Sequence, residues 1–190
     1  MLDLCNNGAK MIVVGNRGAG GIANLLLGFV SQQVATHARV PADVIRGRTV
    51  TGGGPVIVGV DSSAAADAAL TLAFEEATAR GADVVAIRAY VPPPPAVVPV
   101  KAVEADERAA LEASLAGWQD KYPSVRLEGL LAVGGPAKVL VSVSRSAQLV
   151  VVGSRGHGSF AGLLLGSVGQ KLMHHAECPV LIAHPGGAVA

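Results

Sequence analysis

Residues 149–183 read LVVVGSRGHGSFAGLLLGSVGQKLMHHAECPVLIA, and this stretch decides the fold. An apolar, β-branched run at 149–152 is followed by a glycine-rich turn at 153–158. A helical pattern then runs from Phe160 or Ala161 to Ala176, and a second apolar run covers 180–183. A strand, a helix and another buried strand in this order predict a right-handed βαβ crossover in a parallel sheet.

The preceding hundred residues continue the same alternation. Short apolar runs predict strands at 56–60, 84–90 and 126–133. Longer periodic stretches predict helices at 64–80, 103–122 and 137–147. We therefore expect an α/β protein, a three-layer α/β/α sandwich with a Rossmann-like sheet.

An internal repeat sets the domain organisation. Residues 11–45 align without a gap to residues 149–183 at an offset of 138, and 16 of the 35 positions are identical. The second copy has about a hundred residues of related context before it, and the first has ten. The expected division is a partial domain at 1–48, a Gly-rich linker at 49–55 and a complete domain at 56–185. The partial domain should hold a strand at 11–14, a helix at 22–37 and a strand at 43–45.

Composition removes several classes of function. Half of the residues are apolar, only 3% are aromatic and the net charge is +1, with no basic run, so a nucleic-acid partner is not expected. No apolar stretch reaches the length of a membrane span. Cys5 and Cys178 follow no metal or redox spacing, which favours reduced thiols in a cytoplasmic protein.

The chemistry-bearing motif follows the strand at 149–152. Gly153 and Gly156 are separated by two residues, and nine more lead to Gly166 and Ser167. A glycine-rich turn between a strand and a helix exposes backbone N–H groups near a positive helix end, which suits phosphate. Ser167 reaches the same phosphates only if the chain folds back around them. A Walker A loop is excluded because no lysine follows these glycines.

This G-x2-G-x9-G-S pattern resembles the ATP-binding signature of the universal stress protein family. Three further stretches are similar to that family: VGVDSS at 58–63, Gly134-x-Pro136, and CPVLI at 178–182. The resemblance implies a five-stranded parallel sheet of order 3-2-1-4-5, with ATP, alone or with Mg²⁺, at the carboxyl ends of strands one and four. Carried over by position, the nucleotide contacts are Val60, Asp61, Ser62, Ala89, Val133, Gly153, Arg155, Gly156, Gly166, Ser167 and Val168.

Within this set the resemblance distributes the roles. Asp61 contacts the adenosine, Ala89 lines the adenine pocket through its backbone and Val133 borders the ribose. The glycines, Ser167 and Val168 bind phosphates and ribose. Two alternative roles are kept: Asp61 as a cap of the following helix, and Arg155 as a solvated loop charge.

The remaining conspicuous residues are given structural roles. His157, His174 and His175 have no carboxylate or cysteine to complete a metal site. Trp118 is expected to pack, and Cys178 to be buried and inert.

The resulting functional hypothesis is an ATP-binding regulator of the stress response with at most slow hydrolysis and no catalytic residue. The alternatives are a dimerisation module that binds no nucleotide, and an ATPase. In the first copy Phe29 replaces Ser167, so that copy should bind no nucleotide. The resemblance implies a homodimer or pseudo-dimer through Val180, Leu181 and Ile182. The strand at 43–45 should pair antiparallel beside 180–183, or two chains should exchange it.

Overall fold

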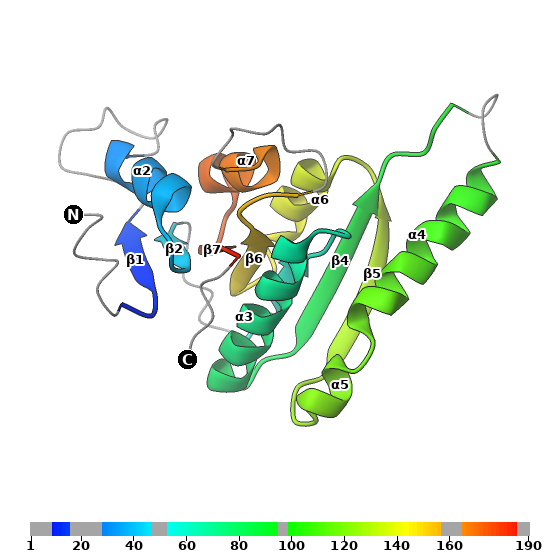
Figure 1. Cartoon of the computed structure of the whole chain (residues 1–190), viewed down its shortest axis with the longest axis horizontal. Coiled ribbons are helices and arrows are strands. Elements are labelled where there is room, and N and C mark those ends of the chain that lie inside the picture. The colour runs from blue at the N-terminus through cyan, green and yellow to red at the C-terminus, as the bar shows by residue number, and fades with distance from the viewer. Residues whose placement is uncertain (1–8, 16–27, 47–52, 95–98, 157–164, 186–190) are drawn as a thin grey trace.

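The computed structural model describes residues 9–15, 28–46, 53–94, 99–156 and 165–185, which form one seven-stranded sheet covered by helices (Figure 1). The strands are β1 (Ile12–Gly15), β2 (Ala42–Ile45), β3 (Val56–Gly59), β4 (Val84–Tyr90), β5 (Leu127–Val133), β6 (Leu149–Gly153) and β7 (Val180–Ala183). The helices are α2 (Phe29–His37), α3 (Ala64–Arg80), α4 (Val100–Leu115), α5 (Trp118–Lys121), α6 (Pro136–Val143) and α7 (Ser167–His175).

The strand order is β1-β2-β7-β6-β3-β4-β5, and the five strands from β7 to β5 are all parallel. Counted from β3, this is the predicted order 3-2-1-4-5, which is confirmed together with the α/β class. The order reverses between β3 and β6, so the chain leaves these two neighbouring strands toward opposite faces. Such a switch point opens a crevice at the carboxyl ends of the strands.

Apolar side chains on both faces of the sheet bury it between two helical layers. Val56 and Val58 of β3 face a cluster that includes Leu70 and Phe74 of α3, whereas Ile57 faces the other layer with Leu140 of α6. Both clusters consist mainly of Val, Ala, Leu and Ile, as the composition predicts. One aromatic group extends the first cluster: Phe74 stacks on Trp118 and Tyr122 at centroid distances of 5.2 Å and 4.9 Å. Trp118 is thus a packing residue.

Three predicted helices have different bounds in the structure. The helix expected at 103–122 is broken by Gly117, whose φ of +78° suits glycine and ends the helical path, leaving α4 and α5. The helix expected at 137–147 begins at Pro136 and ends at Val143. The helix expected from Phe160 begins at Ser167, because Leu165 and Gly166 are not helical; residues 157–164 lie outside the described part. The start predicted for the helix at 22–37 also lies outside it.

The N-terminal strands join the same sheet. β1 pairs parallel with β2, and β2 pairs antiparallel with β7 through Ala42↔Ile182, Asp43↔Leu181 and Val44↔Val180. The predicted antiparallel addition beside 180–183 is therefore confirmed, and it occurs within one chain. The linker expected at 49–55 is described only from Gly53 onward.

Candidate functional site

The adjacency of β3 and β6 brings Asp61 against the glycine-rich turn. Asp61 follows β3 and Gly156 follows β6, and these strands are hydrogen-bonded neighbours. A methyl group built on Gly156 would lie 2.5 Å from Oδ2 of Asp61. A side chain at this position would have to displace the Asp61 carboxylate. The carboxylate of Asp61 after β3 and the glycine turn after β6 therefore lie at one corner of the site.

Asp61 also organises the start of α3. Its Oδ1 accepts a hydrogen bond from the N–H of Ser63 at 3.0 Å and another from the Ser63 hydroxyl. Ser63 occupies the N-cap position, and its side chain makes no cap hydrogen bond to the helix. The alternative role of Asp61 in shaping the helix entrance is thus present in the structure, alongside its contact with the turn.

Gly153 allows close packing between β6 and α3. A methyl group on Gly153 would lie 2.7 Å from Cβ and 3.0 Å from the carbonyl oxygen of Ala65. These are backbone-fixed atoms of the first turn of α3, so they have little room to move. The glycine therefore keeps the start of α3 close to the turn after β6.

The two halves of the glycine motif meet. The N–H of Gly166 donates to the carbonyl of Ser154 at 2.7 Å, and the N–H of Ser154 donates to the carbonyl of Ala183 at 2.7 Å. A methyl group on Gly166 would be 3.6 Å from Cα of Arg155 and 3.8 Å from N of Gly156. The chain thus folds back as the motif requires. Ser167 begins α7, is exposed and lies beside the turn, and Val168 packs on the core below it.

The other predicted contacts spread along the same edge of the sheet. Val60 is buried after β3 and donates its N–H to the carbonyl of Ile87 at 3.0 Å. Ala89 of β4 lies beside Ala132 of β5, and Val133 ends β5 with 66% of its surface exposed. Three strand spacings separate β5 from β6, or roughly 14 Å. Val133 is therefore not in contact with the glycine turn, and only an extended ligand would reach both.

One interaction at this edge was not predicted. Nη1 of Arg88 in β4 donates to Oγ of Ser62 at 3.2 Å, and its Nε pairs with Oε2 of Glu107 in α4 at 2.5 Å. The Arg88 side chain is only 13% exposed. A single arginine within the apolar run VVAIRAY was the available signal, because a charge in a buried strand needs a partner. Arg88 thereby links Ser62 to Glu107 of α4.

The remaining candidates are Arg155, within the glycine turn itself, and the histidines and Cys178. Arg155 is exposed, and His157 is outside the described residues. The rings of His174 and His175 are 6.2 Å apart and tilted by 48°. Among the residues placed in the structure, no three His, Cys, Asp or Glu side chains gather as metal ligands. Cys178 is fully buried, and burial raises the pKa of its thiol to about 11, in agreement with an inert residue.

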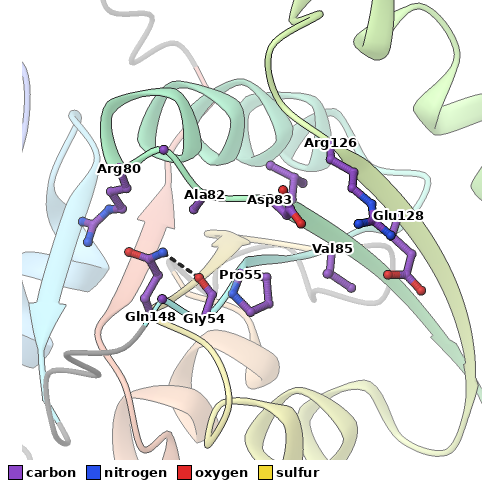
Figure 2. A pocket seen from close by; sticks show the side chains of 12 residues that line it. Gly54, Pro55, Arg80, Ala82, Asp83, Val85, Arg126, Glu128 and Gln148 are labelled. Atoms are coloured by element: carbon purple, nitrogen blue, oxygen red, sulfur yellow. Dashed lines mark hydrogen bonds between the residues drawn. The ribbon is translucent and has the colours of Figure 1, made fainter.

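A cavity of about 380 Å³ lies at the opposite, amino-terminal edge of the sheet (Figure 2). Its wall includes Arg80, Asp83, Arg126 and Glu128, and Gln148 donates to the carbonyl of Gly54 across it at 2.6 Å. None of the predicted contact residues lines this cavity. The cavity lies at the amino-terminal ends of the strands, whereas the glycine motif follows a carboxyl end, and its wall carries charges of both signs.

None of the helices described is both long and apolar enough to cross a membrane.

Comparison with known proteins identifies relatives over most of the chain. The family model described as the universal stress protein family matches residues 6–46 and 54–184. A universal stress protein of Mycolicibacterium smegmatis is 39% identical over 183 residues, covering 93% of this chain and 62% of the relative. One from Mycobacterium tuberculosis H37Rv is 38% identical over 190 residues, with coverages of 96% and 64%. The chain thus spans somewhat less than two thirds of these relatives.

Solved structures agree. A universal stress protein from Archaeoglobus fulgidus superposes with a TM-score of 0.71 at 25% identity, covering 97% of this chain and 65% of the other. A universal stress protein solved in complex with cAMP matches with a TM-score of 0.55 at 26% identity, covering 70% and 99%. The matched family, the strand order and the folded-back glycine motif lead to one conclusion: this chain belongs to the universal stress protein family.

Proposed function

We propose that this chain binds ATP, or another adenine nucleotide, at the carboxyl ends of β3 and β6 and regulates a stress response in the cytoplasm. The observation that carries the proposal is the convergence of Gly153, Gly156, Gly166 and Ser167 beside Asp61. Backbone N–H groups of the turn and the start of the nine-residue helix α7 provide partial positive charge for phosphate. The structure of a relative bound to cAMP supports an adenine nucleotide as the ligand.

The proposed contacts are those that the family resemblance assigns by position. Ser167 and the glycines take the phosphates, with Arg155 as an exposed cation beside them. Asp61 and Val60 take the adenosine, with Ser62 beside them, and Ala89 and Val133 border the base and ribose farther along the edge. Val168, the second residue of α7, takes part with Ser167 and the glycines in the phosphate and ribose contacts. Any Mg²⁺ would arrive with the nucleotide, and hydrolysis would be slow at most.

Two other functions are outcomes of the same test. A dimerisation module that binds no nucleotide would use only the sheet edge, and an ATPase would turn the nucleotide over.

We further propose that residues 1–48 are a partial domain that binds no nucleotide, with 49–55 as linker and 56–185 as the complete domain.

Calorimetric titration with ATP, ADP and cAMP tests the site, using Ser167→Asp as the informative variant. Ser167 is exposed at the first position of α7, so aspartate keeps the helix start but repels phosphate. Ser146→Asp is the matched control, because Ser146 is also exposed and lies beside Gly54, away from the motif. We expect binding by wild type and Ser146→Asp and at least a tenfold loss in Ser167→Asp. No binding of any nucleotide to wild type refutes the proposal.

A turnover assay on the same proteins separates the regulator from the enzyme. Release of inorganic phosphate from ATP faster than about one per minute would identify an ATPase, because typical enzymes turn over about 1–1,000 times per second. We expect bound ATP to be recovered intact over several minutes.

A further inference from the structure

The β2–β7 pairing has two-fold symmetry at the level of residues. The register joins Ala42 to Ile182, Asp43 to Leu181 and Val44 to Val180. The internal repeat, with its offset of 138, makes 42, 43 and 44 equivalent to 180, 181 and 182. Exchanging the two strands therefore reproduces the same three pairs, as in the self-complementary interface of a two-fold dimer. The local two-fold axis passes between Asp43 and Leu181.

The symmetry extends to the side chains that follow each strand. Arg46 and His184 are equivalent by the same offset. Nη1 of Arg46 donates to the carbonyl of Met173 near the end of α7, and the backbone of Ala35 near the end of α2 lies close enough to the His184 ring to act on its pKa. Ala35 and Met173 are again equivalent. Each side chain thus reaches the carbonyl end of the opposite helix, where backbone acceptors need partners.

The symmetry fails at its centre. Leu181 is 1% exposed and packs in the core beside α3, whereas its equivalent Asp43 is 8% exposed. Oδ1 of Asp43 has no hydrogen-bond donor among the described residues, and Glu76 and Arg80 of α3 are charged groups that act on it. Within the described chain, the buried side-chain atoms without partners are Asp43 Oδ1, Arg46 Nε and His184 Nε2. The pairing is therefore less well satisfied than the core.

We infer that residues 28–46 are a docking segment specific for the β7 edge, and that Asp43 lets this segment bind β7 while rejecting a second copy of itself. Two β2 strands paired with the same register would place two buried carboxylates opposite each other, which is destabilising. Two β7 strands would place Leu181 opposite Leu181, which is compatible with a buried centre. Docking within the chain therefore closes an edge that the β7 of a second copy would otherwise use.

The first test is Arg46→Glu in the full chain, with oligomeric state measured by analytical ultracentrifugation. Glutamate opposes the carbonyl end of α7, so the segment should undock and the freed β7 edges should pair. We expect a monomeric wild type and a dimeric variant. Arg39→Glu is the control, since Arg39 is exposed in the same segment and the charge change is equal. A wild-type dimer that Arg46→Glu dissociates would show exchange of segments between chains and overturn the inference.

The second test places the charge on the other strand. In His184→Glu the new carboxylate would be repelled by the carbonyl end of α2, so the segment should undock. In a β7–β7 pair the same carboxylate would meet the carbonyl end of the second copy's α7, so that dimer should not form either. Only β2–β2 pairing remains, and Asp43 forbids it. We therefore expect His184→Glu to be a monomer and His184→Glu with Asp43→Leu to be a dimer. A dimer of His184→Glu alone would overturn the role of Asp43.

Hydrogen exchange measured by mass spectrometry distinguishes undocking from unfolding in these variants. Undocking should raise exchange at 42–45 while 84–90 stays protected, since β4 is interior to the sheet. Unchanged exchange at 42–45 in both Arg46→Glu and His184→Glu would contradict the docking contacts. Loss of protection at 84–90 as well would mean that the variants unfold, and the test would then rest on Asp43→Leu alone. This variant should remain monomeric and melt at a higher temperature than wild type. A lower melting temperature would overturn the inference.

Discussion

Asp43 lies directly opposite Leu181 across the antiparallel pair of β2 and β7, so a carboxyl group shares a buried row with an aliphatic side chain. Burial, with a smaller contribution from Glu76, raises the pKa of Asp43 from 3.8 to about 6, and Arg80 opposes this shift. Ionised Cys178 would act in the same direction as Glu76, but its own pKa is raised to about 11. The position is therefore sensitive to pH.

Asp43→Asn should stabilise the protein at pH 8 and leave it unchanged at pH 4. A carboxyl whose folded pKa is raised destabilises the folded state above that pKa, and the loss disappears as pH falls through 6 toward 3.8. The shift corresponds to an upper bound of about 3 kcal/mol. Urea unfolding at the two pH values measures the difference. Asp106→Asn, at an exposed position of α4, is the control and should change neither value.

His184→Gln should reduce the loss of stability on acidification. Burial lowers the pKa of His184 below 6.5, and the positive charge of Arg155 acts in the same direction, while the nearby backbone of Ala35 opposes it. A histidine with a lowered pKa destabilises the folded state as pH falls below 6.5, because the unfolded chain binds the proton more readily. Glutamine keeps an N–H donor without titrating. Thermal melts between pH 7 and 5 measure the effect, with the exposed His175→Gln as control; parallel curves for wild type and His184→Gln would contradict it.

Gly153→Ala should destabilise the protein by about 1–3 kcal/mol, the cost of overpacking against fixed atoms. The added methyl meets Cβ and the carbonyl of Ala65 at 2.7 Å and 3.0 Å. Gly135→Ala is the matched control, because nothing lies within 4 Å of a methyl there and its φ of −67° suits any residue. Chemical denaturation followed by the fluorescence of Trp118, the single tryptophan, reports both. Equal stability of the two variants would show that α3 moves away freely.

Arg88→Met should cost about 1–3 kcal/mol and weaken nucleotide binding, since Glu107 and Ser62 both lose their partner. The comparison is Arg108→Met, which breaks the 3.3 Å pair with Glu104 within α4. That pair is about half exposed, so its loss should stay within about 0.5 kcal/mol. Melting temperature and ATP titration measure the two effects. If Arg108→Met lowered stability more than Arg88→Met, the buried ion pair would not be the more stabilising of the two.

Much of the fold followed from local sequence signals. The bounds of α3, β4 and β7 agree with prediction to the residue, because Gly81, Pro92 and Pro179 mark the boundaries. Gly117 was missed as a helix break, since one glycine within a charged periodic stretch is tolerated in many helices. In the site, the return of Gly166 to the turn after Gly153 was stated only as a condition for shared phosphate binding, and the family resemblance of the spacing favoured it. The Arg88–Ser62 contact was not predicted because nothing local specifies which buried partner an arginine takes.

Ser154 belongs to two parts of the molecule at once. Its N–H is bonded to Ala183, at the end of the strand that pairs with β2, and its carbonyl holds the N–H of Gly166, next to Ser167. The backbone of a single residue therefore links the edge where the N-terminal segment docks to the turn of the glycine motif. Free-energy effects of substitutions in these two places should not add, and a double-mutant cycle across Ser154 would give their coupling directly.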